Sequence, residues 1–538
     1  MSRSRGADAL AASLVSEGVK RVFTLSGNHI MALFDAALDA GIELVHVRHE
    51  AAAVHMADAW ARLTGEVGVA LVTGGPGHAN AVAALYTANM AESPVVLLSG
   101  HAPLAELGMA AFQEMRQVEM AAPACKASGM SGKSDDVGSD FVKAVIVAKS
   151  GRPGPVHLSL PTDVLEGEWR SGARRHSRDG GNADLASPAY LAIDASSLLT
   201  RLKYTRPLVI CGPMCATRRG RERMAALEAA SGIPVIAMES PRGMADPSLG
   251  QFAALVAKAD SILLVGKRLD FTLKFGKTLA ADCDVFQIDT DRSEIERTVR
   301  AIGGKLKGTA QGETFAALDA LAKASEKSAS KAWLAEVHAA IAHRPPEWDR
   351  AASSRAACLH PVQALRPLQA LLDANPEAVF VSDGGEFGQW AQACLHAPDR
   401  VINGVAGAIG AALPFALAAR LARPGAPVIA AMGDGTFGFH PAEIDTAVRY
   451  RLPFVAVVGN DARWNAEYQI QLRDYGPGRL IGCELLPTRY DQVAIAFGGH
   501  GEHVTDAAQL LPAARRAIDS GRPAVLNVMI DGVAAPKM

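Results

Sequence analysis

Two aspartates in the last third of the chain each follow a short, nearly continuous apolar run. Asp434 stands between Gly433 and Gly435, and Asp461 comes 27 positions later (461 − 434) after the next apolar run. This spacing accommodates one helix and one strand, so both carboxylates are predicted to emerge at the same edge of a parallel sheet. The glycines let backbone approach a phosphate, and paired carboxylate oxygens suit Mg²⁺. The pattern therefore predicts a site for a metal and a diphosphate, whereas Gly-Asp-Gly alone would be a common turn.

A third acidic residue, Glu50, stands where a predicted strand meets a predicted helix in the first part of the chain. In most proteins such a glutamate caps a helix or is a solvated charge. Here the helix is followed by a buried strand that runs into Gly74-Gly75-Pro76-Gly77. A tight glycine turn at the end of a buried strand therefore occurs near both ends of the chain, in the place where open parallel sheets bind ligands.

Short apolar runs separated by helical patterns would position these groups. Such runs are typical of parallel sheets covered on both faces. The predicted fold class is α/β, with three doubly wound parallel-sheet domains at residues 1–170, 186–325 and 356–538 and a polar linker at Ser171–Pro188. The predicted strands are Val22–Leu25, Ile42–Val47, Val67–Thr73, Val95–Ser99, Val156–Leu160, Leu208–Cys211, Val235–Ala237, Ile262–Val265, Val285–Ile288, Val379–Ser382, Val428–Met432, Phe454–Val458 and Ala524–Met529.

The composition argues against several classes of partner. The net charge is −2, so nothing favours binding to nucleic acid or to an anionic membrane. The seven cysteines are scattered without CxxC pairs, which favours reduced thiols over a disulfide or zinc framework. The sequence shows no signal-peptide pattern and no uncharged apolar stretch of about 20 residues. We therefore expect a cytoplasmic protein without a membrane span.

With these motifs, the chain resembles the thiamine diphosphate enzymes, a family that includes acetolactate synthase, pyruvate oxidase, pyruvate decarboxylase and benzaldehyde lyase. The resemblance covers essentially the whole chain, in the order pyrimidine-binding, central and diphosphate-binding domain. It rests on GDG with Asn460-Asp461, on VRHEAAAVHMADAWARLTGEVGVALVTGGPG and on GVAGAIGAALPFALAAR. It implies thiamine diphosphate and Mg²⁺ as cofactors, with Asp434, Asp461 and the backbone oxygen of Arg463 as metal ligands. Asp461 departs from the family's usual asparagine and adds a negative charge.

The resemblance also implies contacts along the cofactor. Glu50 is expected to bond the pyrimidine ring and so activate the cofactor. The Gly407 carbonyl is expected to hold the 4′-amino group, and Ile409 to support the bent cofactor. The other expected cofactor contacts are Gly74, Pro76, Glu386, Phe387, Gly433, Asp434, Gly435, Thr436 and Asp461.

Three further residues are expected near the reaction centre. His29, in SGNHIMALFDA, matches a histidine of benzaldehyde lyase and is expected to move protons, which suits an imidazole pKa near neutrality. Gln113, in AAFQE, matches the family's active-site glutamine. Glu467 lies six positions after Asp461, where pyruvate decarboxylase has a glutamate and benzaldehyde lyase has none. A structural role for His29 and a solvated position for Glu467 stay open.

The resemblance predicts a lyase or carboligase acting on a small carbonyl substrate, a 2-keto acid or a 2-hydroxy ketone, like acetolactate synthase or benzaldehyde lyase. One alternative is a 2-keto acid or acyl-CoA decarboxylase. Another, of a different class, is a regulatory protein that binds the cofactor without catalysis. Bound FAD is an alternative that the loose match of GKRLDFTLKFG disfavours. The resemblance also implies a homodimer or homotetramer with active sites at the subunit interface.

Overall fold

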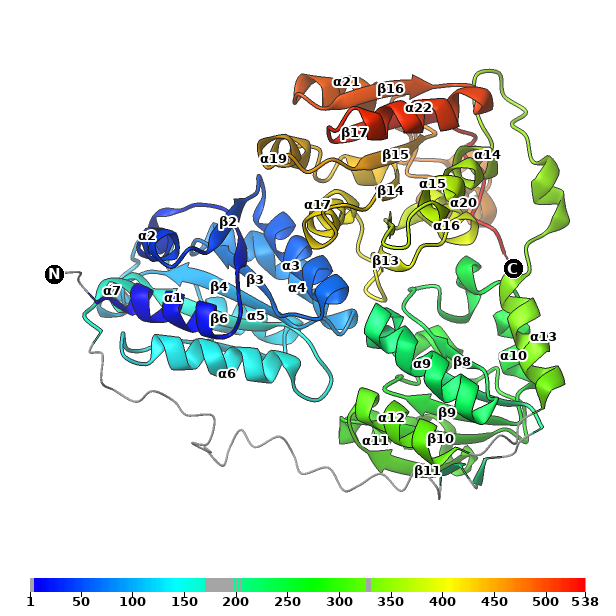
Figure 1. The fold of residues 1–538 in the computed structure, drawn as a ribbon, viewed down its shortest axis with the longest axis horizontal. Helices are drawn as coiled ribbons and strands as arrows, with labels where there is room; N and C mark the ends of the chain where they lie inside the picture. The colour runs from blue at the N-terminus through cyan, green and yellow to red at the C-terminus, as the bar shows by residue number, and fades with distance from the viewer. Residues whose placement is uncertain (1–3, 170–197, 200, 203–204, 326–329, 538) are drawn as a thin grey trace. The chain divides into compact units, whose positions relative to one another are not determined.

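The computed structural model describes residues 4–169, 198–199, 201–202, 205–325 and 330–537 (Figure 1). The chain divides into two compact units, Met1–Ala189 and Tyr190–Met538. The first unit contains one sheet and the second contains two, and the strands within each sheet are parallel. This confirms the predicted α/β class with three parallel-sheet domains. The predicted domain ends stay predictions, and the predicted linker at 171–188 lies outside the described residues.

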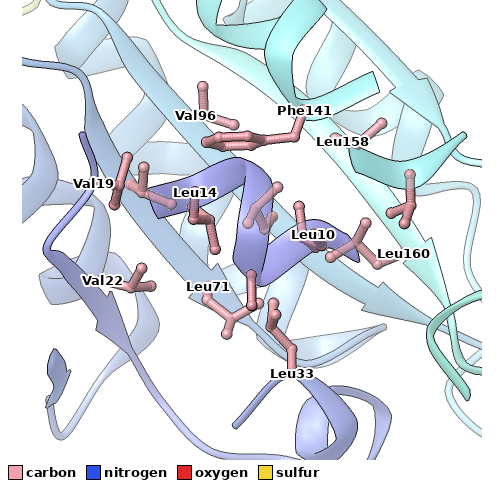
Figure 2. Close-up of a cluster of buried hydrophobic side chains, with 14 of the residues drawn as sticks. Leu10, Leu14, Val19, Val22, Leu33, Leu71, Val96, Phe141, Leu158 and Leu160 are labelled. Atoms are coloured by element: carbon pink, nitrogen blue, oxygen red, sulfur yellow. The ribbon is translucent and has the colours of Figure 1, made fainter. Parts of the chain in front are cut away.

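The first unit is a six-stranded sheet with helices on both faces. Its strands are β1 (Arg21–Thr24), β2 (Glu43–His46), β3 (Gly68–Val72), β4 (Val95–His101), β5 (Ala127–Met130) and β6 (Val156–Pro161), and its helices are α1 (Gly6–Ser16), α2 (Met31–Asp39), α3 (Glu50–Thr64), α4 (Pro76–Met90), α5 (Gln117–Ala121), α6 (Val137–Lys149) and α7 (Thr162–Glu166). The strand order is β2-β1-β3-β4-β6-β5. On one face, Leu14, Leu33 and Phe141 from α1, α2 and α6 pack against strand residues such as Leu71 (Figure 2). Helices α3 and α4 lie on the other face (Figure 1).

The first sheet of the second unit is buried on both faces, which explains the continuous apolar runs of its strands in the sequence. Its elements are β7 (Pro207–Cys211), β8 (Val235–Ala237), β9 (Ser261–Val265), β10 (Asp284–Asp289), β11 (Leu306–Gln311), α9 (Arg218–Ser231), α10 (Phe252–Lys258), α11 (Arg292–Ile302), α12 (Thr314–Ala324) and α13 (Lys331–Ala342). The strand order is β11-β10-β9-β7-β8. In β9, Leu263 and Val265 join one hydrophobic cluster, while Ile262 and Leu264 join another. Since successive side chains point to opposite faces, both faces of this sheet are buried.

The second sheet of this unit repeats the strand order of the first unit. Its elements are β12 (Val379–Ser382), β13 (Asp399–Ile402), β14 (Val428–Gly433), β15 (Val455–Asn460), β16 (His500–Val504), β17 (Ala524–Met529), α14 (Pro361–Leu365), α15 (Gln369–Asp373), α16 (Gly385–Cys394), α17 (Ala412–Ala422), α18 (Asp434–Phe437), α19 (Glu443–Arg449), α20 (Asn465–Tyr475), α21 (Tyr490–Ala496) and α22 (Ala507–Asp519). The order is β13-β12-β14-β15-β17-β16. Strands β12, β14 and β15 are neighbours, so the turns that follow them meet at one edge.

Two expectations from composition can be compared with the structure. Across the described ranges, no helix combines the length and the apolar character needed to cross a bilayer. All seven cysteines lie in these ranges and are free, in agreement with the expectation of reduced thiols.

Candidate active site

A cavity of about 310 Å³ lies at the carboxyl edge of the β12-β14-β15 group in the second unit. Its lining comes from the turns after these strands, from the segment after β13 and from the loop that follows β8. Every predicted site residue of this half of the cofactor lines it. Those residues are Glu386, Phe387, Gly407, Ile409, Gly433, Asp434, Gly435, Thr436, Asp461, Arg463 and Glu467.

The two aspartates form a buried acidic pair in this cavity. Asp434 is 2% exposed and Asp461 is 8% exposed. Burial raises the pKa of Asp434 to about 6, and burial together with the nearby Asp434 charge raises the pKa of Asp461 to about 8. Within the described residues, Asp434 Oδ2 has no hydrogen-bond partner. Two buried carboxylates with an unsatisfied oxygen are unfavourable unless a cation joins them.

The residues present fit Mg²⁺ as that cation. No group of three or more His, Cys, Asp and Glu side chains that could hold a metal occurs in the described part of the chain. A metal here would therefore complete its shell with backbone, phosphate or water oxygens. This is the usual arrangement for Mg²⁺, which binds through one or two carboxylates and keeps other oxygen ligands. The backbone oxygen of Arg463 as a third ligand stays a prediction.

The loop after β15 separates the roles of Asn460 and Asp461. Asn460 Nδ2 donates to the Thr488 carbonyl (2.9 Å) and to Asn527 Oδ1 (3.0 Å), and Asn460 Oδ1 accepts from the Ala462 N–H (3.2 Å). Asn460 is thus turned into the fold, and Asp461 lines the cavity. Ala462 has a φ of +57°, a left-handed conformation that side chains other than glycine rarely adopt. The loop is therefore shaped by its own hydrogen bonds.

The glycines of the GDG turn differ in what surrounds them. A Cβ on Gly435 would lie 2.7 Å from the Trp464 ring, so this glycine lets the ring pack closely. A Cβ on Gly433 would meet no described atom within 4 Å. Gly433 therefore borders open space, as a close approach of a phosphate to backbone requires. Thr436 Oγ1 donates to the Gly433 carbonyl (3.0 Å) and holds the turn.

Ile409, the predicted support for the cofactor, is held by polar groups on both sides. The Gly410 N–H donates to the fully buried Asp383 carboxylate (3.0 Å), and Asn403 Nδ2 donates to the Ala408 carbonyl (2.9 Å). Burial raises the pKa of Asp383, while backbone N–H groups oppose the rise. This carboxylate joins the end of β12 to the segment that carries Ile409.

The other predicted residues of this half include a packing residue and two glutamates. A Cβ on Gly459 would lie only 2.5 Å from the Phe387 ring, so Phe387 packs closely against β15. Glu386 is buried, which raises its pKa, and it accepts the Ala535 N–H. Glu467 lines the cavity from α20 but is exposed, so the structure leaves both its catalytic and its solvated interpretation open.

In the first unit, Glu50 is a buried residue at the start of α3. It is 8% exposed, and Asn80 Nδ2 donates to its Oε2 (3.0 Å). The cap of the helix is made by the preceding residue, His49, which accepts the Ala51 N–H. Glu50 therefore is neither the cap nor a solvated charge. Its other oxygen, Oε1, lies 3.4 Å from where a Cβ on Gly77 would be, beside the glycine turn after β3.

His29 lies beside the same turn. Its Nδ1 is 3.1 Å from Thr73 Oγ1, and its ring stacks on Phe112 with centroids 6.0 Å apart. Burial lowers the pKa of His29, so the imidazole is neutral near pH 7. The structure thus places His29 next to the glycine turn, while proton transfer by this side chain stays a prediction.

Gln113 also contacts the turn. Gly75 has a φ of +59°, and a Cβ there would lie 2.8 Å from both the Cβ and the carbonyl oxygen of Gln113. Gly74 is enclosed as well, because a Cβ would lie 2.7 Å from the Gly100 carbonyl oxygen. Pro76 is exposed at the first position of α4, where proline starts a helix well. The predicted residues of the first unit thus gather around Thr73–Gly77.

A glutamine that the sequence analysis did not single out fixes this turn. Gln117 Oε1 accepts the Gly75 N–H (2.8 Å), and its Nε2 donates to the Gly100 carbonyl (3.2 Å) and to Ser159 Oγ (2.9 Å). Asp383 was missed in the same way, and so was Arg242, which lines the cavity from the loop after β8. The available signals were an aspartate directly after a buried strand for Asp383 and a cation in a strand-to-helix loop for Arg242. Gln117 begins a short helix that is only partly buried, and it gave no such signal.

Two family models and a set of relatives match this chain. The N-terminal TPP-binding domain of thiamine pyrophosphate enzymes matches residues 4–120, and the C-terminal TPP-binding domain matches residues 383–528. An acetolactate synthase large subunit of Mycobacterium tuberculosis is 34% identical over 544 residues, covering 98% of this chain and 96% of that protein. Human 2-hydroxyacyl-CoA lyase 2 is 31% identical over 579 residues, covering 98% of this chain and 90% of that protein. The chain belongs to the thiamine pyrophosphate enzyme family.

Proposed function

We propose that this chain is a lyase or carboligase that uses thiamine diphosphate and Mg²⁺ to break or make a carbon–carbon bond next to a carbonyl. Its substrates would be 2-keto acids or 2-hydroxy compounds. The observation that carries the proposal is the cavity in which the buried pair Asp434 and Asp461 lies beside the open turn at Gly433. The names of the relatives, acetolactate synthase and 2-hydroxyacyl-CoA lyase, support this reaction class.

The residues of the chain divide the work in this proposal. Bound thiamine diphosphate supplies a carbon nucleophile and an electron sink. Asp434 and Asp461 hold the metal, and Gly433 lets the diphosphate approach the backbone. Ile409 supports the cofactor from a segment fixed by Asp383.

The first unit supplies the acid–base groups. Glu50, oriented by Asn80, bonds the pyrimidine ring. His29, neutral and buried beside Thr73, accepts or donates a proton at the substrate oxygen, and Gln113 orients the substrate. Glu467 is a further candidate for proton transfer from the exposed side of the cavity.

The proposal extends to assembly and location. Glu50 belongs to one compact unit and Asp434 to the other, and we propose that a homodimer or homotetramer brings the two together at the subunit interface, in the cytoplasm. Two copies related by a twofold axis would form two equivalent sites. The proposal does not require FAD.

Exchange of the cofactor's C2 proton tests the proposal independently of the substrate. The purified protein with Mg²⁺ and thiamine diphosphate should exchange this proton much faster than free cofactor does. Chelation of the metal and Asp434→Ala should both abolish exchange, whereas Asp519→Ala, an exposed change on α22, should not. Exchange no faster than in free cofactor would favour a regulatory protein that only binds the cofactor.

Product analysis separates the reaction classes. Pyruvate should be tested with and without an acceptor aldehyde, together with a 2-hydroxyacyl-CoA and benzoin as cleavage substrates. A hydroxy ketone product or cleavage to an aldehyde is expected. Release of free aldehyde from pyruvate as the sole product would instead indicate a decarboxylase.

A further inference from the structure

One arginine at the cavity of the second unit has no role in the proposal so far. Arg242 lies on the loop after β8, which belongs to the sheet that supplies none of the predicted cofactor contacts. This loop contributes Ser240, Pro241 and Arg242 to the cavity lining. The Arg242 side chain is 45% exposed, so it stands between the cavity and solvent.

The backbone that carries Arg242 is firmly held. The loop begins next to Glu239, which is paired with the partly buried Arg400 at 2.7 Å. The Arg242 N–H donates to Ser240 Oγ (3.2 Å). The next residue, Gly243, has a φ of +57°, and a Cβ there would lie 2.1 Å from the Thr272 carbonyl oxygen, so backbone approaches backbone closely. Arg242 is therefore presented from a fixed position.

The charges around the cavity leave this guanidinium incompletely matched. The lining contains the carboxyl groups of Glu386, Asp434, Asp461 and Glu467 and the guanidinium groups of Arg242 and Arg463. The Arg463 guanidinium lies over the Tyr468 ring at 4.2 Å, and its charge opposes the rise in the pKa of Asp461. Arg242 pairs with Glu386 at 3.8 Å, which is longer than a hydrogen bond.

Glu386 itself is satisfied by a different donor, the Ala535 N–H. Within the described residues, the Arg242 guanidinium makes this long ion pair and no side-chain hydrogen bond. A guanidinium has five N–H donors in a planar fork that matches carboxylate or phosphate oxygens. Arg242 therefore keeps donors for a further anion.

The position of the loop indicates where in the cavity that anion would lie. Pro241 Cβ lies 3.7 Å from where a Cβ on Gly407 would be, and Gly407 is the residue predicted to hold the 4′-amino group of the cofactor. The reacting carbon of the substrate must lie near that amino group. Arg242 is thus close to the substrate end of the cavity.

We propose that Arg242 binds an oxyanion of the substrate, the carboxylate of a 2-keto acid or a phosphate of an acyl-CoA, and so makes the enzyme selective for anionic substrates. This rests on the proposed function and adds a substrate class to it. A neutral 2-hydroxy ketone such as benzoin would gain nothing from this side chain.

The test compares Arg242→Gln with wild type on pyruvate, on a 2-hydroxyacyl-CoA and on benzoin. A charged hydrogen bond contributes about 1.5–3 kcal/mol, so KM for the anion that Arg242 binds should rise about 10- to 150-fold. The kcat and the KM for benzoin should change by less than about twofold. Whichever anionic substrate shows the rise identifies the bound group as carboxylate or phosphate. Arg242→Lys keeps the charge and loses the planar fork, so it should recover only part of the affinity. Arg219→Gln, an exposed change on α9, is the matched control.

Three results would overturn the inference. An equal rise in KM for benzoin would show a structural effect, and weaker binding of thiamine diphosphate and Mg²⁺ with unchanged KM would assign Arg242 to the cofactor. Recovery of KM in the double variant Arg242→Gln with Glu386→Gln would show that Arg242 merely neutralises Glu386. If the wild-type protein exchanges the C2 proton no faster than free cofactor does, the proposed function itself is refuted. The two failures are therefore distinguishable.

Discussion

The first sheet and the last sheet share one strand order, yet the glycine turns after their third strands are built for different purposes. The turn after β3 is filled by side chains of its own unit, since Gly75 contacts Gln113 and bonds Gln117. The turn after β14 is open, because no described atom lies near the Cβ position of Gly433. The topology thus places both turns at the same position in their sheets. The neighbouring side chains decide whether the space beside each turn is filled or open to a ligand.

The buried polar groups differ in the same way. The first unit buries imidazoles, with His78 and His157 rings 4.5 Å apart, and both have lowered pKa values. The last sheet buries the carboxyl groups of Asp434 and Asp461, whose pKa values are raised. We infer that the first region provides hydrogen bonds and proton transfer, whereas the second provides charge to hold a metal and a diphosphate.

The largest expected effect tests this division of labour. Glu50→Gln should lower kcat by about 10²- to 10⁴-fold, since general acid–base groups contribute at this level, while binding of thiamine diphosphate changes far less. Kinetics and a cofactor titration measure the two quantities. Glu66→Gln, an exposed change just after the same helix, is the control. A loss of cofactor affinity as large as the loss of kcat would break the comparison.

A glycine pair tests the closed and the open turn directly. Gly75→Ala should destabilise the protein by about 1–3 kcal/mol, because its φ of +59° and ψ of −113° strain an alanine. Gly433→Ala should change stability by less than about 0.5 kcal/mol, because its φ of −75° suits alanine and its Cβ meets nothing described. Denaturant unfolding measures both. Gly433→Ala should nevertheless weaken cofactor binding, and equal destabilisation by both variants would contradict the interpretation.

The buried imidazoles predict that acid weakens the first unit. Burial lowers the pKa of His78 to about 4, so the folded state keeps it neutral while the unfolded chain binds a proton near pH 6.5. The stability from this group is therefore greatest well above pH 6.5 and falls as pH drops, by about 1.4 kcal/mol for His78 at pH 5.5. Hydrogen exchange should rise in β3, β4 and β6 more than in β12, β14 and β15. His78→Gln should reduce this difference, and a uniform rise across both units would argue against it.

The smallest effect concerns the unusual second aspartate. The Asp461 charge should make cofactor binding depend more strongly on metal, so Asp461→Asn should lower metal affinity by roughly tenfold, at the lower end of the effects seen around metal sites. Titration of Mg²⁺ against cofactor binding in both proteins measures this. Equal metal dependence in the two would show that the extra charge has no role.

The sequence predicted the central strands, where both faces of the sheet are buried, and missed four of the six edge strands. Strands β5, β11, β13 and β16 lie at the edges of their sheets and were not predicted. In β5, β11 and β16 most side chains are partly buried or exposed, whereas β13 is mostly buried but short and begins with Asp399 and Arg400. Such strands lack the continuous apolar run that marks a buried parallel strand. Packing context, which one sequence does not display, decides these elements.

The same distinction applies to the site. The residues of the GDG segment were predicted because they follow one another along a strand, a turn and a helix. Asp383 and Gln117 were not, because each bonds a residue far along the chain, Gly410 and Gly75, respectively. Arg242 was not, because it lines the cavity from a loop of another sheet. Long-range hydrogen bonds leave no spacing signature in the chain. The family resemblance, now confirmed by the matching models, identified the cofactor and did not identify these supports.

The left-handed conformation of Ala462, in the loop that carries Asp461, has a consequence for the shape of that loop. This backbone costs of order 1 kcal/mol relative to a relaxed one, and a glycine at this position would remove most of that strain. Such a change would relieve the folded state but give the unfolded chain more freedom, so the net stability would change little while the loop became more variable in shape. The chain instead keeps a residue that limits the loop to few conformations before any ligand binds. Replacing Ala462 by glycine would therefore loosen the loop that carries Asp461 without a large gain in stability.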